Sequence, residues 1–241
     1  GVVATKIPGW GEFVLAELTQ TFDRSDISYF FPLLKETTRR LGFHPRYGAF
    51  DAAFDAWYVH ADFHSEQHDG FAAVPFSDRG KKNRIQFNEA GLPLCKAGLA
   101  MPLGSTFWAK TSLVPHEKGR YCCPLASADN DKHVCPVAHK NWAKGGCNTT
   151  IPTSIGARLR YQLDRESQAY KDVYKQRTAT ERINSQAVAL GIERPKIRNG
   201  HAIANQNTLI YIVINLRALR RVKKQTPKQP FTSPSEPESQ K

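Results

Sequence analysis

The sequence predicts an α/β fold that is interrupted by a β-rich insertion. Residues 1–76 alternate short apolar, strand-like runs with amphipathic helical segments, an order that favours parallel strand pairings. Residues 77–164 then lose any helical period and hold all five cysteines. Helical periodicity returns over residues 165–224. With 241 residues, 40% of them hydrophobic, the chain is long enough to bury a substantial core.

The first block, residues 1–76, is predicted to contain four strands and two helices. Ser25 suits the N-cap of the first helix and Gly42 its end, while Pro32 predicts that the first turn begins late or is kinked. The third strand, within RYGAFDAAF, is predicted to be buried and to run into Asp51. The strands are expected at residues 1–5, 11–20, 46–51 and 70–76, and the helices at residues 25–42 and 55–66.

The remaining chain divides into three predicted parts. The insertion, residues 77–164, is rich in Gly, Pro and Lys and contains β-like pieces such as RIQFN and STFWAKTSL, so it is predicted to form β-hairpins. Helices are expected at residues 165–190, ended by Gly191, and at residues 201–222. Residues 225–241 have the Pro and Ser content of a disordered tail. The last helix is expected to pack on the sheet because it is strongly apolar, with Leu209, Ile210, Ile212, Val213, Ile214, Leu216 and Leu219.

Positive charge is concentrated in the last third of the chain. Lys and Arg number 34 against 22 Asp and Glu, a net charge of +12. Residues 158–241 hold 17 basic and 7 acidic residues, a net of +10, which leaves +2 for residues 1–157. Such asymmetry favours a polyanionic partner, and nucleic acid is the usual one, although a solvated basic surface remains the alternative.

Hydropathy argues against a membrane protein. The longest apolar runs are well short of the roughly 20 residues that a membrane-spanning helix needs, and the N-terminus GVVATKIPGW lacks the features of a signal peptide. A cytoplasmic location is therefore expected. Because the chain starts at Gly1 and its one methionine is Met101, we expect the sequence to be a piece of a longer protein.

Two acids occupy positions where a site could form. Asp51 stands at a predicted strand end, where sites form in open α/β sheets, but it could equally cap the following helix, a role for which Asp55 competes. Glu181 lies in the 165–190 helix with Tyr174 and Arg177 at spacings that place all three on one face. A salt bridge between Glu181 and Arg177 is the alternative to a functional role.

Three segments, FDAAFDAWYVH, GFAAVPF and YKQRTATERINS, together resemble the DDE transposases of bacterial insertion sequences. The resemblance implies an RNase H-like core, a mixed sheet with flanking helices, interrupted by a β-rich insertion. Asp51 matches the second acid of the family, in a D-x-x-[YF]-D setting. Tyr174, Arg177 and Glu181 match the signature Tyr, two residues, Arg, three residues, Glu, six residues, Lys.

The sequence departs from the family pattern at two places. The signature Lys falls at Val188, so Lys196 or Arg198 is expected to take over its contact with DNA. The first catalytic Asp is also absent, since the upstream acids Glu12, Glu17, Asp23 and Asp26 lie in the wrong contexts. We expect that the first strand and its Asp lie in a missing N-terminal part and that the chain as written is catalytically incomplete.

The resemblance implies metal-dependent strand cleavage and strand transfer in DNA transposition. Asp51 and Glu181 would be catalytic residues that bind two Mg²⁺ or Mn²⁺ ions. Double-stranded DNA, both element ends and target, would be the partner, with a homodimer in the synaptic complex and a location at the bacterial nucleoid. A non-catalytic DNA-binding remnant is the alternative, and a generic RNase H-like nuclease a third. The expected DNA-binding residues are Tyr174, Lys175, Arg177, Arg182, Lys196 and Arg198.

The cysteines and a histidine of the insertion leave three interpretations open. A basic cytoplasmic protein favours metal ligation or reduced thiols over disulfides, yet paired C-x₂-C knuckles are absent. Cys95 is interpreted as a lone buried residue. Elsewhere, His60, His64 and His68 are predicted to form an exposed polar helix face rather than a metal site. The candidate zinc ligands are Cys122, Cys123, Cys135, His139 and Cys147.

Overall fold

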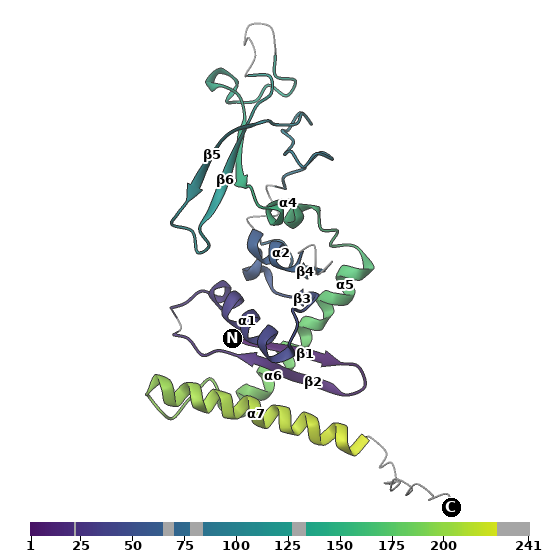
Figure 1. Cartoon of the computed structure of the whole chain (residues 1–241), viewed down its shortest axis with the longest axis vertical. Coiled ribbons are helices and arrows are strands. Elements are labelled where there is room, and N and C mark those ends of the chain that lie inside the picture. Colours follow the sequence, from purple (N-terminus) through teal and green to yellow (C-terminus); the bar gives the residue numbers. More distant parts are fainter. Residues whose placement is uncertain (22, 65–69, 78–83, 127–133, 226–241) are drawn as a thin grey trace, which may run out of the picture.

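The computed structural model describes residues 1–21, 23–64, 70–77, 84–126 and 134–225. These residues form a mixed α/β structure with three small sheets, arranged along one long axis (Figure 1). The sheet of the insertion lies at one end of this axis and helix α7, Gly200–Gln225, lies at the other. Residues 226–241, most of the predicted tail, lie outside the described residues.

An antiparallel hairpin packs against α7. Strands β1, Val2–Ile7, and β2, Gly11–Glu17, pair directly, and α7 contacts β2. The Val14 N–H donates to Asn215 Oδ1 at 2.8 Å, and Asn215 Nδ2 donates to the Val14 carbonyl at 2.9 Å. One α7 side chain thus satisfies both backbone groups of Val14, as a neighbouring strand would.

Only one face of α7 is buried. Ile210 and Ile214 lie in the core beneath the hairpin, as predicted. The prediction that this helix packs on the sheet is confirmed, but its apolar residues are spaced around the helix and a single hairpin covers one stripe of them. The exposed residues are Leu209, Ile212, Val213, Leu216 and Leu219.

The first helix follows its predicted limits. A 3₁₀ turn, η1, spans Asp26–Tyr29, and α1 spans Phe30–Leu41, so the α-helix begins late, as Pro32 predicts. Gly42 ends it at φ 77°, in the left-handed region where glycine is favoured.

A short parallel pair occupies the middle of the molecule. Strand β3, Tyr47–Ala49, pairs in parallel with β4, Phe71–Ala73. The 3₁₀ turn η2, Ala52–Phe54, and helix α2, Trp57–Phe63, connect them. β4 is largely buried, but β3 is exposed or half-buried, so the prediction of a buried third strand is wrong.

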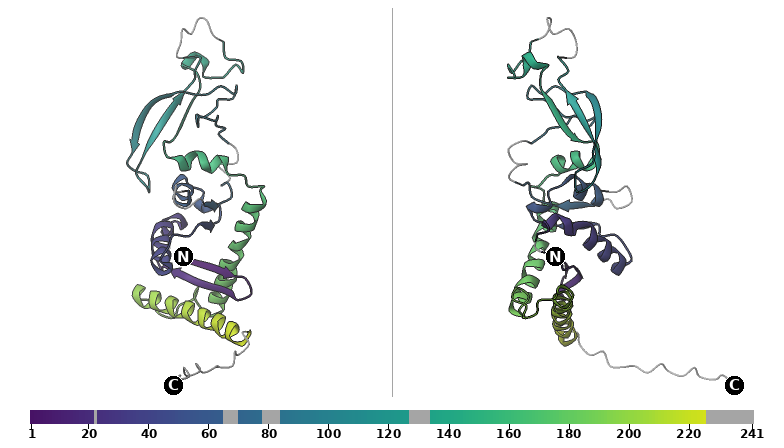
Figure 2. Two further views of the ribbon diagram at one scale, coloured as in Figure 1. Left: turned by 45° about the vertical axis from the view of Figure 1, so that its right-hand side comes forward. Right: turned by 90° about the vertical axis from the view of Figure 1, so that its left-hand side faces the viewer.

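A helical rod, residues 168–189, lies against both two-stranded sheets (Figure 2). It consists of α5, Gln168–Tyr174, the 3₁₀ turn η4, Lys175–Arg177, and α6, Thr178–Ala189. α5 contacts β3 and β4, whereas α6 contacts β1 and β2. The predicted single helix at 165–190 is therefore interrupted by a 3₁₀ turn at its centre.

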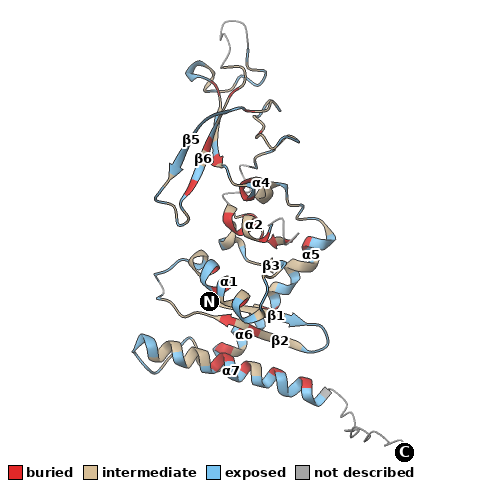
Figure 3. Cartoon of the chain, viewed as in Figure 1, coloured by how far each residue is buried: buried red, intermediate tan, exposed pale blue. Residues whose placement is uncertain are grey.

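The insertion contains an antiparallel sheet in the order β5, β6, β7. Its strands span Leu103–Ala109, His116–Cys122 and Asn148–Pro152, and a 3₁₀ turn, η3, spans Trp142–Lys144. Most of its described residues are exposed or half-buried (Figure 3).

Helix α4, Ile155–Gln162, was not predicted. It packs on α2 so closely that a Cβ at Gly156 would lie 2.1 Å from the Trp57 carbonyl oxygen. The insertion is thereby held against the middle of the molecule.

Candidate functional site

Asp51 lies two residues beyond the end of β3. The Phe50 N–H donates to the Ala73 carbonyl, which extends the β3–β4 pairing to the residue before Asp51. Asp51 is exposed, and its Oδ1 accepts a hydrogen bond from the Ala53 N–H at 2.9 Å, so it caps η2. The cap engages Oδ1 and leaves Oδ2 as a potential ligand atom at the strand end.

Tyr174, Arg177 and Glu181 form one contacting group on the helical rod. Arg177 Nη2 lies 2.8 Å from Glu181 Oε1, and the guanidinium carbon lies 5.7 Å from the centre of the Tyr174 ring. The Arg177 and Glu181 side chains are 35% and 52% exposed, so solvent and an external ligand can reach them. The predicted salt bridge is therefore present, and it joins the residues of the sequence signature to one another.

The fold brings the segments that carry Tyr174 and Arg177 to the strand that leads to Asp51, whereas Glu181 lies on α6, which contacts β1 and β2. The turn η4, which ends at Arg177, contacts β3, and so does α5. Among the described residues, however, no three Asp, Glu, His or Cys side chains gather in an arrangement that could hold a metal ion. Asp51 and Glu181 therefore do not belong to a three-residue metal-ligand group among the described residues.

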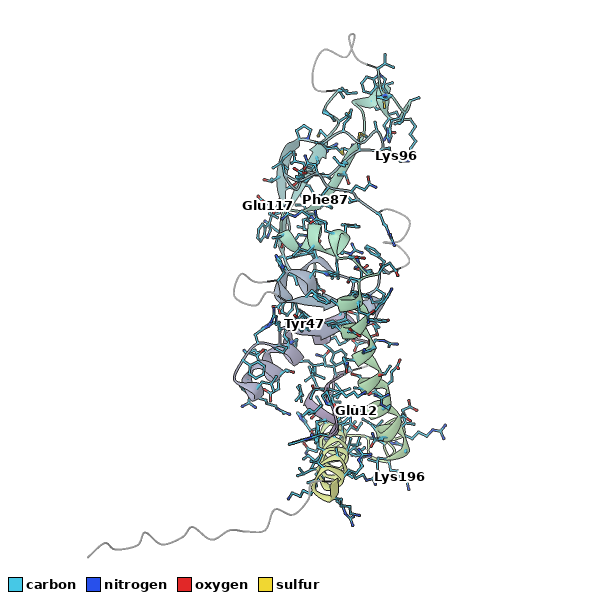
Figure 4. The ribbon with its side chains drawn as sticks, turned by 90° about the vertical axis from the view of Figure 1, so that its right-hand side faces the viewer. Glu12, Tyr47, Phe87, Lys96, Glu117 and Lys196 are labelled. Atoms are coloured by element: carbon cyan, nitrogen blue, oxygen red, sulfur yellow. The ribbon has the colours of Figure 1, made fainter. Side chains whose placement is uncertain are left out.

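The other predicted DNA-binding residues differ in their surroundings. Lys175 Nζ lies 2.5 Å from Asp172 Oδ1, and Arg182 forms an ion pair with Glu12 of β2. Lys196 and Arg198 are exposed in the connection between α6 and α7. Figure 4 shows Lys196 at the end of the molecule below Glu12, away from Tyr47 of β3. Lys196 is therefore not positioned beside the strand that leads to Asp51.

Val188 replaces the signature Lys on α6. Its side chain is 44% exposed, so the position faces solvent and a longer residue would fit. The fold gives no packing reason for an apolar residue there.

A buried ion pair lies beside the candidate site and was missed by the sequence analysis. Asp55 has a side chain with 0% exposure, and Arg160 of α4 donates to its two oxygens at 2.7 and 2.6 Å. The Ser77 N–H donates to Oδ2 at 2.9 Å. Burial alone would raise the pKa of Asp55, but Arg160 and the Ser77 amide hold it well below its usual range.

His60 and Arg165 extend this buried group. His60 is 3% exposed, which makes the prediction of an exposed histidine face wrong at this position; His68 lies outside the described residues. Desolvation lowers the pKa of His60, which favours the neutral ring. Arg165 donates to the Val74 carbonyl at 2.9 Å and lies 3.6 Å from the centre of the Phe76 ring. The cluster thus fastens α4 and the start of the helical rod to β4.

The cysteines separate into two groups. Cys123, Cys135 and Cys147 line one pocket together with His139, and Cys95 joins them there. Cys122 is the last residue of β6 and does not line this pocket. Cys95, interpreted from the sequence as a lone residue, is therefore a member of the cluster.

The chain matches no protein-family profile, no curated protein and no solved structure. In the described part of the chain, no helix has the length and apolar character required to cross a membrane.

Proposed function

We propose that this chain is part of a DDE transposase, an enzyme that cleaves DNA strands and transfers them during transposition of an insertion sequence. The observation that carries the proposal is the contacting group Tyr174, Arg177 and Glu181, which lies on an element packed beside the strand that leads to Asp51. Asp51 matches the second acid of the family, and the other three residues match its Tyr, Arg and Glu signature.

The proposed core is RNase H-like, with one mixed sheet. The arrangement that supports it is an antiparallel hairpin and a parallel pair along one helical rod. Within the described residues, β1 pairs with β2 alone and β3 with β4 alone. An additional strand between β1 and β3 would join the two pairs, and in the proposed fold this strand carries the first catalytic Asp.

Asp51 and Glu181 suit Mg²⁺ in part. Both are exposed carboxylates, the hard oxygen donors that Mg²⁺ prefers, and each has one oxygen outside the contacts described above. They make an incomplete set that needs the upstream Asp. When bound, two such ions activate the attacking oxygen and stabilise the leaving oxygen of a phosphodiester.

Arg177 is the residue best placed to hold a DNA phosphate beside Glu181. Its guanidinium has five N–H donors, and the contact with Glu181 uses one nitrogen. Planar, bidentate donation suits phosphate oxygens. The Tyr174 ring, 5.7 Å away, limits the orientations of the guanidinium. Lys175, Arg182, Lys196 and Arg198 would add a more diffuse positive field along the DNA.

The proposal is tested by strand cleavage with the gene product that includes the coding sequence upstream of Gly1. Glu181→Gln is expected to abolish Mg²⁺-dependent cleavage of element-end DNA and to leave DNA binding nearly unchanged, because it removes a metal ligand and one negative charge. Glu193→Gln removes an exposed acid outside the site and is the matched control. Undiminished cleavage by Glu181→Gln would rule out its catalytic role.

A non-catalytic DNA-binding remnant is the second candidate. The absence of a third acid near Asp51 and Glu181 in the described residues favours it. The coding DNA upstream of Gly1 separates the two: an in-frame strand with a central Asp supports the enzyme, and a stop codon or frameshift supports the remnant.

A further inference from the structure

Four cysteines converge on one small pocket near the end of the insertion. Cys95, Cys123, Cys135 and Cys147 come from four separate segments and line a cavity of about 10 Å³. A space of this size holds roughly one water-sized body. The five cysteines, all within the described residues, form no disulfide. The fold therefore places four sulfur atoms around room for one small occupant.

The strand geometry selects Cys123 over its neighbour Cys122. Consecutive side chains at a strand end point to opposite faces. Cys122 points toward β5, where a Cβ on Gly104 would lie 2.9 Å from its Sγ. Cys123 is 3% exposed and faces the pocket. One member of the adjacent pair is thus available to the cluster.

His139 lines the pocket but is not arranged as a metal ligand. The Asn141 backbone N–H donates to His139 Nδ1 at 3.2 Å. A backbone amide can only donate, so Nδ1 uses its lone pair in this contact. A metal at Nδ1 would have to displace this amide. Four sulfur atoms remain as the candidate ligand set.

Backbone amides point toward two of these sulfur atoms. The His139 N–H approaches Cys135 Sγ at 3.5 Å. The backbone amides of Leu125 and Ala126 point toward the Cys123 thiol. Amide donors of this kind stabilise a thiolate, the form in which cysteine binds a metal.

Two glycine turns allow the chain to approach the pocket. Gly98, at φ 75°, closes a tight turn in which its N–H donates to the Cys95 carbonyl at 2.9 Å. Gly146, at φ 79°, lies so near Cys123 that an added Cβ would be 2.6 Å from the Cys123 Cβ. This close approach brings the next residue, Cys147, to the cluster.

The described part of the insertion shows no apolar core large enough to fix this end. The hydrophobic clusters in the described residues lie around the hairpin with α7 and around α1, α2 and β4. In the described residues of the insertion outside its strands, few apolar side chains are buried, and Met101 and Cys123 are among them. Small lobes of this kind are commonly stabilised by a metal or by disulfides.

We propose that Cys95, Cys123, Cys135 and Cys147 bind one structural Zn²⁺ ion in a tetrahedral site. No three of these side chains already stand in ligand geometry in the described residues, so binding draws the sulfur atoms inward to about 2.3 Å from the ion. The thiols release their protons as the thiolates coordinate. The site rests on the insertion alone and is independent of the proposed DNA chemistry.

The test begins with the whole chain purified in reductant and supplied with Zn²⁺. Elemental analysis is expected to find about one zinc per chain, and X-ray absorption to show four sulfur neighbours at about 2.3 Å. Cys95→Ser is expected to lose most of the zinc. Cys122→Ser is the matched control and is expected to keep it, because Cys122 is next to Cys123 in sequence but does not line the pocket. His139→Gln also keeps it.

Several outcomes overturn the proposal. One is wild-type chain without zinc after reconstitution, and another is a disulfide found by thiol titration of freshly purified protein. A site of three sulfurs and one nitrogen, or zinc lost from Cys122→Ser but kept by Cys95→Ser, also contradicts the ligand set. Because the absorption measurement uses the wild-type chain, the test does not depend on whether Cys95→Ser folds.

Discussion

Replacing Asp55 by Asn is expected to destabilise the fold strongly. The Asp55 side chain is 0% exposed and binds both a guanidinium nitrogen pair of Arg160 and the Ser77 N–H. Asparagine keeps one oxygen but turns an amide group toward the Arg160 donors, which leaves a largely buried cation unpaired. Breaking a buried pair in this way costs about 3–5 kcal/mol. For a chain of this size, that corresponds to a fall in Tm of roughly 6–20 °C.

Urea unfolding followed by tryptophan fluorescence measures the effect. The control is Glu36→Gln, which removes a half-buried acid paired with the exposed Arg39 and Arg40 on α1 and should shift the unfolding midpoint little. The double variant Asp55→Leu with Arg160→Met should recover much of the loss, since apolar residues can replace a buried pair. A loss below about 1 kcal/mol for Asp55→Asn would refute the buried-pair explanation.

The same pair predicts a pH dependence. The pKa of Asp55 is lower in the folded chain than in the unfolded chain, where it is about 3.9. The ionised carboxylate therefore stabilises the fold above about pH 4, and this stability is lost as pH falls from there toward the folded-state pKa. The stability difference between wild type and Asp55→Asn should shrink below about pH 4, and a constant difference would contradict the assignment.

Two further predictions concern packing and charge. Gly156→Ala is expected to loosen the α2–α4 contact and lower Tm, because its Cβ would meet the Trp57 carbonyl oxygen at 2.1 Å. Gly200→Ala is the control, since an added Cβ meets nothing within 4 Å there. Equal Tm values for the two variants would contradict the close approach. DNA affinity should fall steeply as the salt concentration rises, because phosphate neutralisation releases counterions. Arg177→Ala should weaken binding and reduce the dependence of affinity on salt. Titrations that show no salt dependence would refute DNA binding through the basic surface.

Local patterns predicted the elements whose limits are set by nearby residues. Pro32 and Gly42 act within one helix, so the late start and the end of α1 could be derived from them, whereas Ser25 precedes η1 and makes no side-chain cap hydrogen bond. The mixed α/β class likewise followed from the order of strands and helices. The burial of β3 could not be predicted, since it depends on what covers a three-residue strand.

Contacts between segments far apart in the sequence could not be predicted from the sequence. Asp55 and Arg160 are 105 positions apart, and either could have been an ordinary surface charge. Cys95 lies far from the other cysteines in sequence, which is why it was interpreted as a lone residue. The apolar residues of α7 gave the helix correctly, but their spacing around it could not show that one stripe remains exposed. The ion pair could have been found by asking which charged residues near α2 and α4 are buried.

We propose that Asp51 and Glu181 bind the same metal centre. It is tested most directly by Fe²⁺-mediated cleavage of the polypeptide in the gene product that includes the upstream coding sequence. Fe²⁺ that replaces Mg²⁺ reduces added hydrogen peroxide and is oxidised to Fe³⁺, and the hydroxyl radicals formed in this step cut the nearest backbone. The account predicts cuts near both Asp51 and Glu181, suppressed together by excess Mg²⁺ and by either Asp51→Asn or Glu181→Gln. Cuts near one acid that persist when the other is changed would contradict it.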